Sequence, residues 1–177
     1  KTSRVFDALS AGGADVRFVG GCVRDAVLGR TVNDIDVGTP EAPPEVVERL
    51  GAAGIKVVPT GIDHGTVTAV VAHTPFEITS LRRDVETDGR RAVVAYTADW
   101  AEDAARRDFT MNVMSCRPDG ALFDYFGGWD DLAGGRVRFV GDPETRIRED
   151  MLRILRFYRF HAHYGAGEPD AAARAAC

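Results

Sequence analysis

The chain has 177 residues, of which 45% are hydrophobic, so it can bury a sizeable core, and one domain or slightly more is expected. Its net charge of −5 argues against a protein that coats nucleic acid indiscriminately, although a local basic surface is compatible with it. No apolar run approaches the roughly 18 residues of a membrane span, and three scattered cysteines without a CxxC pair argue against zinc or disulfides and favour a reducing, cytoplasmic setting.

The first hundred residues predict short helices and strands in alternation. Helices are expected over 4–13, 22–29 and 44–54, and strands over 16–20, 34–39, 55–58, 65–72 and 76–81. Proline is tolerated at the start of a helix, and the Pro43-Pro44 pair marks the third one. The last three strands are expected to pair antiparallel. The polar segment 82–100 has too little regular apolar spacing for a core and predicts a mobile loop or an extended hairpin.

The second half is predicted to be mostly helical. A helix is expected over 101–115, a strand, turn and short helix over 121–132, and the longest helix over 143–165. The apolar stripe of the long helix is expected to comprise Ile147, Met151, Ile154, Leu155 and Tyr158. Asp170 is typical of a helix N-cap, but the sequence ends soon after it and begins at Lys1. We therefore expect a fragment of a longer protein.

A glycine pair, Gly20-Gly21, lies between a predicted strand and a predicted helix. Without Cβ atoms the backbone there can approach a phosphate closely, and N–H groups at a helix start favour an anion. Arg24, one turn later, could add a charged donor. A plain tight turn would explain the same glycines.

Two aspartates, Asp34 and Asp36, flank Ile35 in the next predicted strand. Because side chains alternate along a strand, both carboxylates are expected on one face. Two such charges repel each other unless a cation lies between them, and two Mg²⁺ ions suit a phosphoryl transfer. Glu77, between Phe76 and Ile78, could reach the same metals. Ordinary surface acids are the alternative in each case.

The stretch "ARRDFTMN" places Arg106, Arg107 and Asp108 side by side. An arginine there could bind phosphate, and the aspartate could accept a hydrogen bond from a ribose hydroxyl. The alternative is a helix salt-bridge cluster with Glu102 and Asp103, which the local sequence favours.

The long predicted helix carries Asp150, Arg153, Arg156 and Arg159. Asp150 and Arg153, three residues apart, are neighbours on its surface. Cytosine and adenine both present an amino donor beside a ring-nitrogen acceptor, and an aspartate with an arginine complements that pattern but not that of guanine or uracil. An ordinary ion pair is the alternative.

The order of these motifs, "GGCVRDAVLG", "DIDVGT", "HGTV", "FEITSLR", "ARRDFTMN" and "REDMLRILRFYRF", resembles the class II tRNA nucleotidyltransferase and bacterial poly(A) polymerase family from about Val16 to Tyr164. The resemblance implies an α+β, polymerase-β-like head with a mixed, largely antiparallel sheet flanked by helices. It implies a head domain over 1–140 and the start of an all-α neck over 141–177, with body and tail domains absent.

The resemblance also implies roles for individual residues. Asp34 and Asp36 would be catalytic and would bind Mg²⁺, and the segment 82–94, which includes Asp88 and Arg90, would be a flexible loop that helps the pocket switch from CTP to ATP. Asp150 and Arg153 would read the base. The nucleotide-binding residues would be Gly20, Gly21, Arg24, Arg107, Asp108, Asp150, Arg153, Arg156 and Arg159.

The expected activity is therefore addition of C and A from CTP and ATP to the 3′ end of tRNA, with release of pyrophosphate. A poly(A) polymerase that uses ATP alone is the nearest alternative, and an enzyme adding only CC is disfavoured because the 82–94 loop carries Asp88 and Arg90. A noncatalytic nucleotide- or RNA-binding head is the alternative from another class, and the Asp34–Asp36 pair argues against it.

Overall fold

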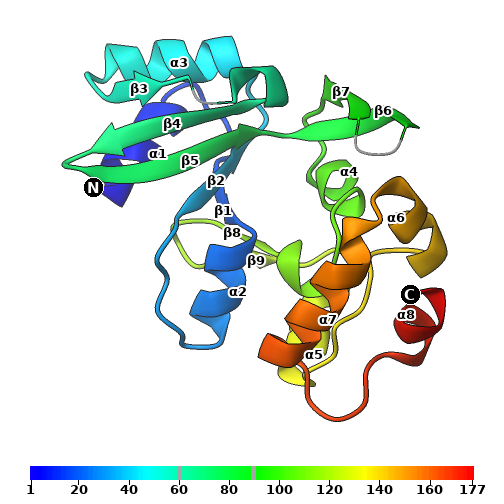
Figure 1. Cartoon of the computed structure of the whole chain (residues 1–177). Coiled ribbons are helices and arrows are strands. Elements are labelled where there is room, and N and C mark those ends of the chain that lie inside the picture. The colour runs from blue at the N-terminus through cyan, green and yellow to red at the C-terminus, as the bar shows by residue number, and fades with distance from the viewer. Residues whose placement is uncertain (60, 89–90) are drawn as a thin grey trace.

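The computed structural model describes residues 1–59, 61–88 and 91–177 (Figure 1). The helices are α1 (Thr2–Ser10), α2 (Gly21–Val27), α3 (Pro43–Ala52), α4 (Trp100–Ala105), α5 (Gly128–Ala133), α6 (Pro143–Glu149), α7 (Leu152–Tyr164) and α8 (Ala171–Ala176), with 3₁₀ turns η1 (Ile62–His64) and η2 (Thr110–Asn112). The strands are β1 (Arg17–Val19), β2 (Asp36–Thr39), β3 (Lys56–Val58), β4 (Thr66–Val71), β5 (Thr74–Ser80), β6 (Arg82–Asp88), β7 (Arg91–Tyr96), β8 (Ser115–Cys116) and β9 (Leu122–Phe123).

Within these residues, seven strands form one sheet in the order β3-β4-β5-β2-β1-β8-β9. Every pairing in it is antiparallel except that of β2 with β5, which is parallel. The expected mixed, largely antiparallel sheet flanked by helices is confirmed. β6 and β7 pair with each other as a separate hairpin, which is the extended-hairpin form of the 82–100 prediction. Arg90, named in the prediction of a switching loop over 82–94, lies outside the described residues.

Helices α1 and α3 cover one face of the sheet, and Figure 1 shows both beside β3 to β5. Val5 and Leu9 of α1 and Leu50 of α3 share a buried cluster with the sheet residues Val37 and Ile78. Val37 lies opposite Ile78 where β2 pairs with β5. Because side chains alternate along a strand, the preceding residue of each strand faces away from this core. The pairing thus directs the acidic side chains of Asp36 and Glu77 toward the other face of the sheet.

A second hydrophobic cluster joins the segment after α4 to α7. The Phe109 ring lies 4.9 Å from the Phe139 ring and 5.1 Å from the Phe160 ring, and Phe139 stacks on Phe157 at 5.8 Å. The cluster therefore includes residues from both sides of position 140. Helix α7 is packed on the rest of the chain by these rings, and the division into 1–140 and 141–177 stays a prediction.

The prediction of one helix over 101–115 is wrong after Ala105. Helix α4 ends at Ala105, and the backbone after it turns to pair with residues 138–140 instead. Thr110 N–H donates to the Arg138 carbonyl at 3.0 Å, and Val140 N–H donates to the Asp108 carbonyl at 2.9 Å. These long-range hydrogen bonds replace the intrahelical ones, and 115–116 becomes strand β8.

The prediction of one continuous helix over 143–165 is also wrong, because α6 and α7 are separated at Asp150. This residue has φ −152° and ψ 107°, which is extended backbone. Its Oδ1 accepts a hydrogen bond from Leu152 N–H at 3.0 Å, so the side chain competes with the helix and starts a new one. The change of direction leaves Met151 and Leu155 of the expected apolar stripe 64% and 69% exposed, and Tyr158 is also exposed.

Other local signals hold. Helix α3 begins at Pro43 as expected, and the Asp170 side chain accepts from Ala173 N–H, which confirms the predicted N-cap of α8. In the part of the chain that the structure describes, no helix combines the length and apolar character that crossing a membrane requires.

Candidate functional site

The glycine turn between β1 and α2 requires glycine at its first position. Gly20 has φ +70° and ψ −134°, a conformation that side chains with a Cβ rarely adopt. A Cβ on Gly20 would lie 3.6 Å from Asp36 Oδ2 and 3.9 Å from Arg107 Nη1. The Asp36 carboxylate, at the start of β2, and the Arg107 guanidinium thus both lie close to the Gly20 backbone, which no side chain of its own covers.

The acidic side chains gather at the start of β2. The parallel register places Asp36 directly opposite Glu77 of β5. Asp34 lies in the bend just before the strand, and all three residues line a hollow of about 260 Å³. Burial raises the pKa of Asp36, the charges of Glu77 and Asp34 raise it further, and Arg107 opposes them. Glu77, which the sequence offered as a possible third metal ligand, therefore lies beside the pair.

These carboxylates could supply some, but not all, of the oxygen ligands of a hard divalent cation. Across the described ranges, no group of three His, Cys, Asp or Glu side chains is arranged to hold a metal ion. Mg²⁺ does not need such a cage, since it is commonly bound by one or two carboxylates and completes its shell with water and substrate phosphate oxygens. Asp34 and Asp36 supply the oxygen donors that this chemistry needs.

Next to this hollow lies a cavity of about 660 Å³, to which Asp36 also contributes. It brings together predicted site residues from four segments of the chain. These are Gly20, Gly21, Arg24, Asp36, Arg107, Asp108, Asp150, Arg153 and Arg156. Arg159 is not among the lining residues and is exposed on α7, so its role stays a prediction.

The cavity also has lining residues that were not among the predicted nucleotide-binding residues. They are Arg82, Arg106, Asn112, Leu152 and Phe160. Arg106 and Asn112 stand in the "ARRDFTMN" stretch, and that proximity was the available signal. Arg82 ends the "FEITSLR" motif, but its place at the cavity depends on the fold, because it starts the hairpin and bonds to residues in and just after α4. Together the lining holds six arginines and three aspartates, so it is suited to a polyanion.

A hydrogen-bond network crosses the floor of the cavity from α7 to α2. Arg156 Nε donates to Asp108 Oδ2 at 2.8 Å, and Asp108 Oδ1 accepts from Asn112 Nδ2 at 3.1 Å. Asn112 Oδ1 then accepts from Arg24 Nη1 at 2.7 Å. Arg24 is further held by Asp25 through Nε and Nη2, both at 2.9 Å. Residues from "GGCVRD", "RRDFTMN" and α7 are therefore one connected unit.

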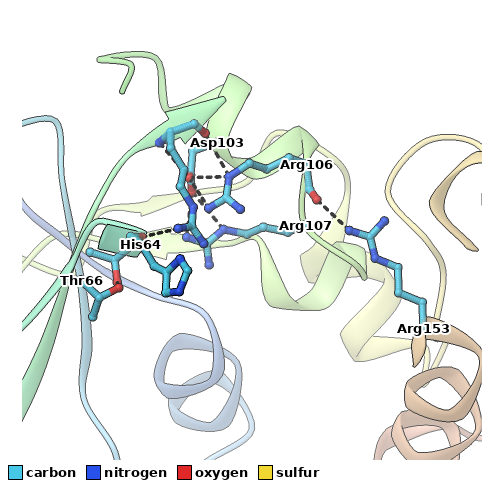
Figure 2. Close-up of polar contacts among 8 residues, drawn as sticks. His64, Thr66, Asp103, Arg106, Arg107 and Arg153 are labelled. Carbon is cyan, nitrogen blue, oxygen red and sulfur yellow. Dashed lines mark hydrogen bonds and ion pairs between the residues drawn. The ribbon is translucent and has the colours of Figure 1, made fainter. Parts of the chain in front are cut away.

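The alternative of a salt-bridge cluster in "ARRDFTMN" is confirmed for Asp103 but not for Glu102, and it is compatible with a role at the site. Figure 2 shows Asp103 of α4 contacting both Arg106 and Arg107. Both arginines also line the cavity, whereas Glu102 bonds Thr97 instead. The two arginines of these ion pairs thus form part of the cavity wall, and Asp103 lies behind them.

The proposed base-reading pair lies at the break between α6 and α7. Arg153 Nη1 donates to Glu149 Oε2 at 2.8 Å, and its Nη2 donates to the Arg106 carbonyl at 3.1 Å. The guanidinium is thereby tied to the end of α4 across the cavity (Figure 2). Because Asp150 leaves helical geometry, the two side chains do not stand on one regular helix as the sequence predicted.

Comparisons with known proteins agree with this geometry. A model of the family described as poly A polymerase head domain matches residues 16–138. The chain is 49% identical over 148 residues to the human CCA tRNA nucleotidyltransferase 1, mitochondrial, covering 83% of this chain and 34% of that protein. It is 42% identical over 167 residues to the CCA-adding enzyme of Oceanobacillus iheyensis, covering 93% of this chain and 41% of that enzyme.

Solved structures show the same likeness. The Bacillus stearothermophilus CCA-adding enzyme in complex with CTP superposes with a TM-score of 0.84 at 33% identity, covering 97% of this chain and 40% of that one. A tRNA nucleotidyltransferase complexed with a primer tRNA and an incoming ATP analog superposes with a TM-score of 0.77 at 28% identity, covering 97% and 48%. The chain thus spans between 34% and 48% of the length of these four proteins.

Proposed function

The chain belongs to the poly A polymerase head domain family, and from that premise we propose that it is the nucleotide-binding head of a CCA-adding tRNA nucleotidyltransferase. Such an enzyme transfers C and A residues from CTP and ATP to the tRNA 3′ end and releases pyrophosphate. The observation that carries the proposal is the cavity in which the Gly20-Gly21 turn, Asp36 and six arginines converge. The names of the relatives favour this activity over a poly(A) polymerase that uses ATP alone.

The phosphate end of the nucleotide is proposed to lie at the glycine turn. Backbone at Gly20 and Gly21 can approach phosphate oxygens without steric hindrance from a Cβ. Arg24 and Arg107 flank the turn: Arg24 Nη2 lies 3.5 Å from an ideal Cβ on Gly21, and Arg107 Nη1 lies 3.9 Å from one on Gly20. Guanidinium groups donate paired hydrogen bonds to phosphate, so both can balance its charge and orient it.

The reacting centre is then the α-phosphate, held next to Asp36. The tRNA 3′-oxygen attacks the α-phosphorus, the bond from that phosphorus to the β-bridging oxygen breaks, and pyrophosphate leaves. Asp34 and Asp36, with Glu77 beside them, would hold the Mg²⁺ ions. When bound, these ions lower the pKa of the attacking hydroxyl and stabilise negative charge on the phosphoryl oxygens.

The base is proposed to lie between Asp150 and Arg153, on the far side of the cavity. An aspartate oxygen accepts from the amino group of cytosine or adenine, and an arginine N–H donates to the adjacent ring nitrogen. Asp108 would meet the ribose, since it lies between the two ends of the cavity network. Guanine or uracil would leave the Asp150 and Arg153 side chains without matching hydrogen-bond partners, which is the physical source of the selectivity.

We also propose the division into a head over 1–140 and the beginning of a neck over 141–177, with tRNA held mainly by parts outside this chain. The compartment is a prediction as well. The three cysteine thiols are free, which suits a reducing compartment such as the cytosol, although the vertebrate relatives carry mitochondrial names.

Calorimetric titration with ATP, CTP, GTP and UTP in Mg²⁺ tests the proposal. We expect binding of CTP and ATP only, and loss of that selectivity in Asp150→Ala. Asp150→Asn is the matched variant, because its side-chain oxygen can still cap Leu152 N–H and keep α7 in place. Glu144→Ala, on the exposed face of α6, is the neutral control. Binding of ATP alone would favour the poly(A) polymerase, and equal binding of all four nucleotides would contradict base reading by Asp150.

Catalysis is separated from mere binding by the double variant Asp34→Ala with Asp36→Ala. In a protein of the relatives' full length, an enzyme loses CCA addition in this variant. A noncatalytic RNA-binding head keeps its RNA affinity and shows no activity to lose. Measurement of both quantities on the same preparation distinguishes the two classes.

A further inference from the structure

Asp103 is a buried carboxylate that stands directly behind the cavity wall. It is only 3% exposed, and it is not one of the cavity-lining residues. Its Oδ2 accepts from Arg107 Nε at 3.0 Å and Nη2 at 2.7 Å. Its Oδ1 accepts from Arg106 Nη2 at 2.8 Å and Nε at 3.1 Å. One carboxylate therefore binds two adjacent guanidinium groups, as Figure 2 shows.

The same carboxylate also holds the first residue of the β6–β7 hairpin. Asp103 Oδ1 accepts from Arg82 N–H at 3.2 Å, and Arg106 Nε donates to the Arg82 carbonyl at 3.0 Å. Both backbone groups of Arg82 are thus bonded by the Asp103–Arg106 pair. Since Arg82, Arg106 and Arg107 all line the cavity, one buried side chain organises three of its six arginines.

Asp103 binds one edge of the Arg107 guanidinium, and this contact determines which nitrogen faces the cavity. Asp103 engages Nε and Nη2 of Arg107, whereas Nη1 is the nitrogen near Gly20. A guanidinium is planar and rigid, so fixing one edge sets the direction of the opposite nitrogen. Burying a charged carboxylate such as that of Asp103 costs free energy, and only close pairing with cations offsets this cost. Its burial therefore distinguishes this contact from an ordinary ion pair on the surface.

We propose that Asp103 is a positioning residue that holds Arg107 by one edge, so that Nη1 faces the Gly20-Gly21 turn where a phosphate oxygen of the incoming nucleotide binds. Through Arg82 it also fixes the base of the β6–β7 hairpin against α4. The role toward phosphate rests on the proposed function, whereas the role toward the arginines does not.

The test uses the 177-residue chain and four variants. Asp103→Asn keeps the size of the side chain and an oxygen for Arg82 N–H, but removes the charge that holds Arg107. Asp99→Ala is the matched control, because Asp99 Oδ1 caps the same helix by accepting from Ala101 N–H at 2.8 Å. Arg107→Ala and the double variant Asp103→Asn with Arg107→Ala complete a mutant cycle. Calorimetry with CTP in Mg²⁺ and with inorganic tripolyphosphate measures affinity, and thermal unfolding measures stability.

We expect Asp103→Asn to weaken both ligands about tenfold or more, whereas Asp99→Ala destabilises the chain without that loss. The double variant should bind no more than about twofold more weakly than Arg107→Ala alone, because a positioning residue has no effect once its target is gone. Equal affinity in Asp103→Asn and Asp99→Ala would overturn the proposal. So would additive losses in the double variant.

A second measurement separates this inference from the proposed function. Nε–H signals of Arg106 and Arg107 in ¹⁵N-edited NMR spectra report whether the side chains are held, without any nucleotide. If the wild-type chain binds neither ligand, the proposed function fails and the spectra decide the positioning role. Loss of both ordered signals in Asp103→Asn but not in Asp99→Ala supports that role, and unchanged signals in Asp103→Asn refute it.

Discussion

Removal of the Asp108 carboxylate is expected to break the ion pair between α7 and the cavity floor and to destabilise the fold. Asp108 is 9% exposed and has contacts on both oxygens. Oδ2 accepts from Arg156, and Oδ1 accepts from Phe109 N–H at 2.8 Å and from Asn112 Nδ2 at 3.1 Å. Hydrogen bonds to a charged group contribute about 1.5–3 kcal/mol, and a half-exposed ion pair contributes about 1 kcal/mol or less.

Asp108→Ala loses all of these contacts and leaves Asn112 Nδ2 without its acceptor, so we expect a loss of about 3 kcal/mol in the free energy of unfolding. Asp108→Asn keeps an oxygen for Phe109 and Asn112 and loses the ion pair to Arg156, so about 1 kcal/mol is expected. For a chain of this size, 3 kcal/mol corresponds to a fall in Tm of about 6–12 °C.

Urea unfolding with an unchanged m-value measures both losses. Glu144→Ala is the control: its ion pair with Arg148 lies on the surface, and we expect a change within about 0.5 kcal/mol. The reasoning is refuted if Asp108→Ala and Asp108→Asn cost the same, since the oxygen shared by Phe109 and Asn112 would then contribute nothing. It is refuted equally if both variants match the control.

Three further outcomes are expected. The hydrogen bond from Arg117, with that from Arg17, lowers the pKa of Asp15 from 3.8 to about 2, so its stabilisation is fully present above pH 3.8 and is lost as the pH falls through 2. Asp15→Asn should therefore cost roughly 1–2 kcal/mol at pH 7, and urea unfolding should show that difference shrinking toward pH 2. Gly20→Ala and Gly29→Ala both place a Cβ on backbone with positive φ and should both destabilise the chain, but only Gly20→Ala should weaken CTP binding, because nothing lies within 4 Å of a Cβ on Gly29. The 177-residue chain should bind CTP yet extend a tRNA lacking its CCA end slowly, because phosphate contacts elsewhere carry much of the affinity for RNA; turnover equal to that of a full-length relative would contradict this.

Local chemistry made several parts of this site predictable. The glycine pair was expected as a turn between a strand and a helix, and it lies between β1 and α2, where Gly20 has φ +70°. The alternation of Phe76, Glu77 and Ile78 placed Glu77 away from the core, and both apolar neighbours are buried. Long-range contacts decided the rest. The segment after Ala105 left its helical pattern because Thr110 and Val140 found backbone partners across 28 to 32 residues.

The sequence by itself determined which residues could do the chemistry, because short motifs specify turns, strand faces and charge clusters through local geometry. Only the tertiary structure decided which of them meet. The parallel pairing of β2 with β5 set Glu77 opposite Asp36, and the break at Asp150 turned Arg153 toward the end of α4. Asp103, which the local pattern indicated as an ordinary helix salt bridge, became a buried centre for three arginines because the chain folded the hairpin against α4. Contacts of this kind depend on strand order and packing, and no local periodicity contains them.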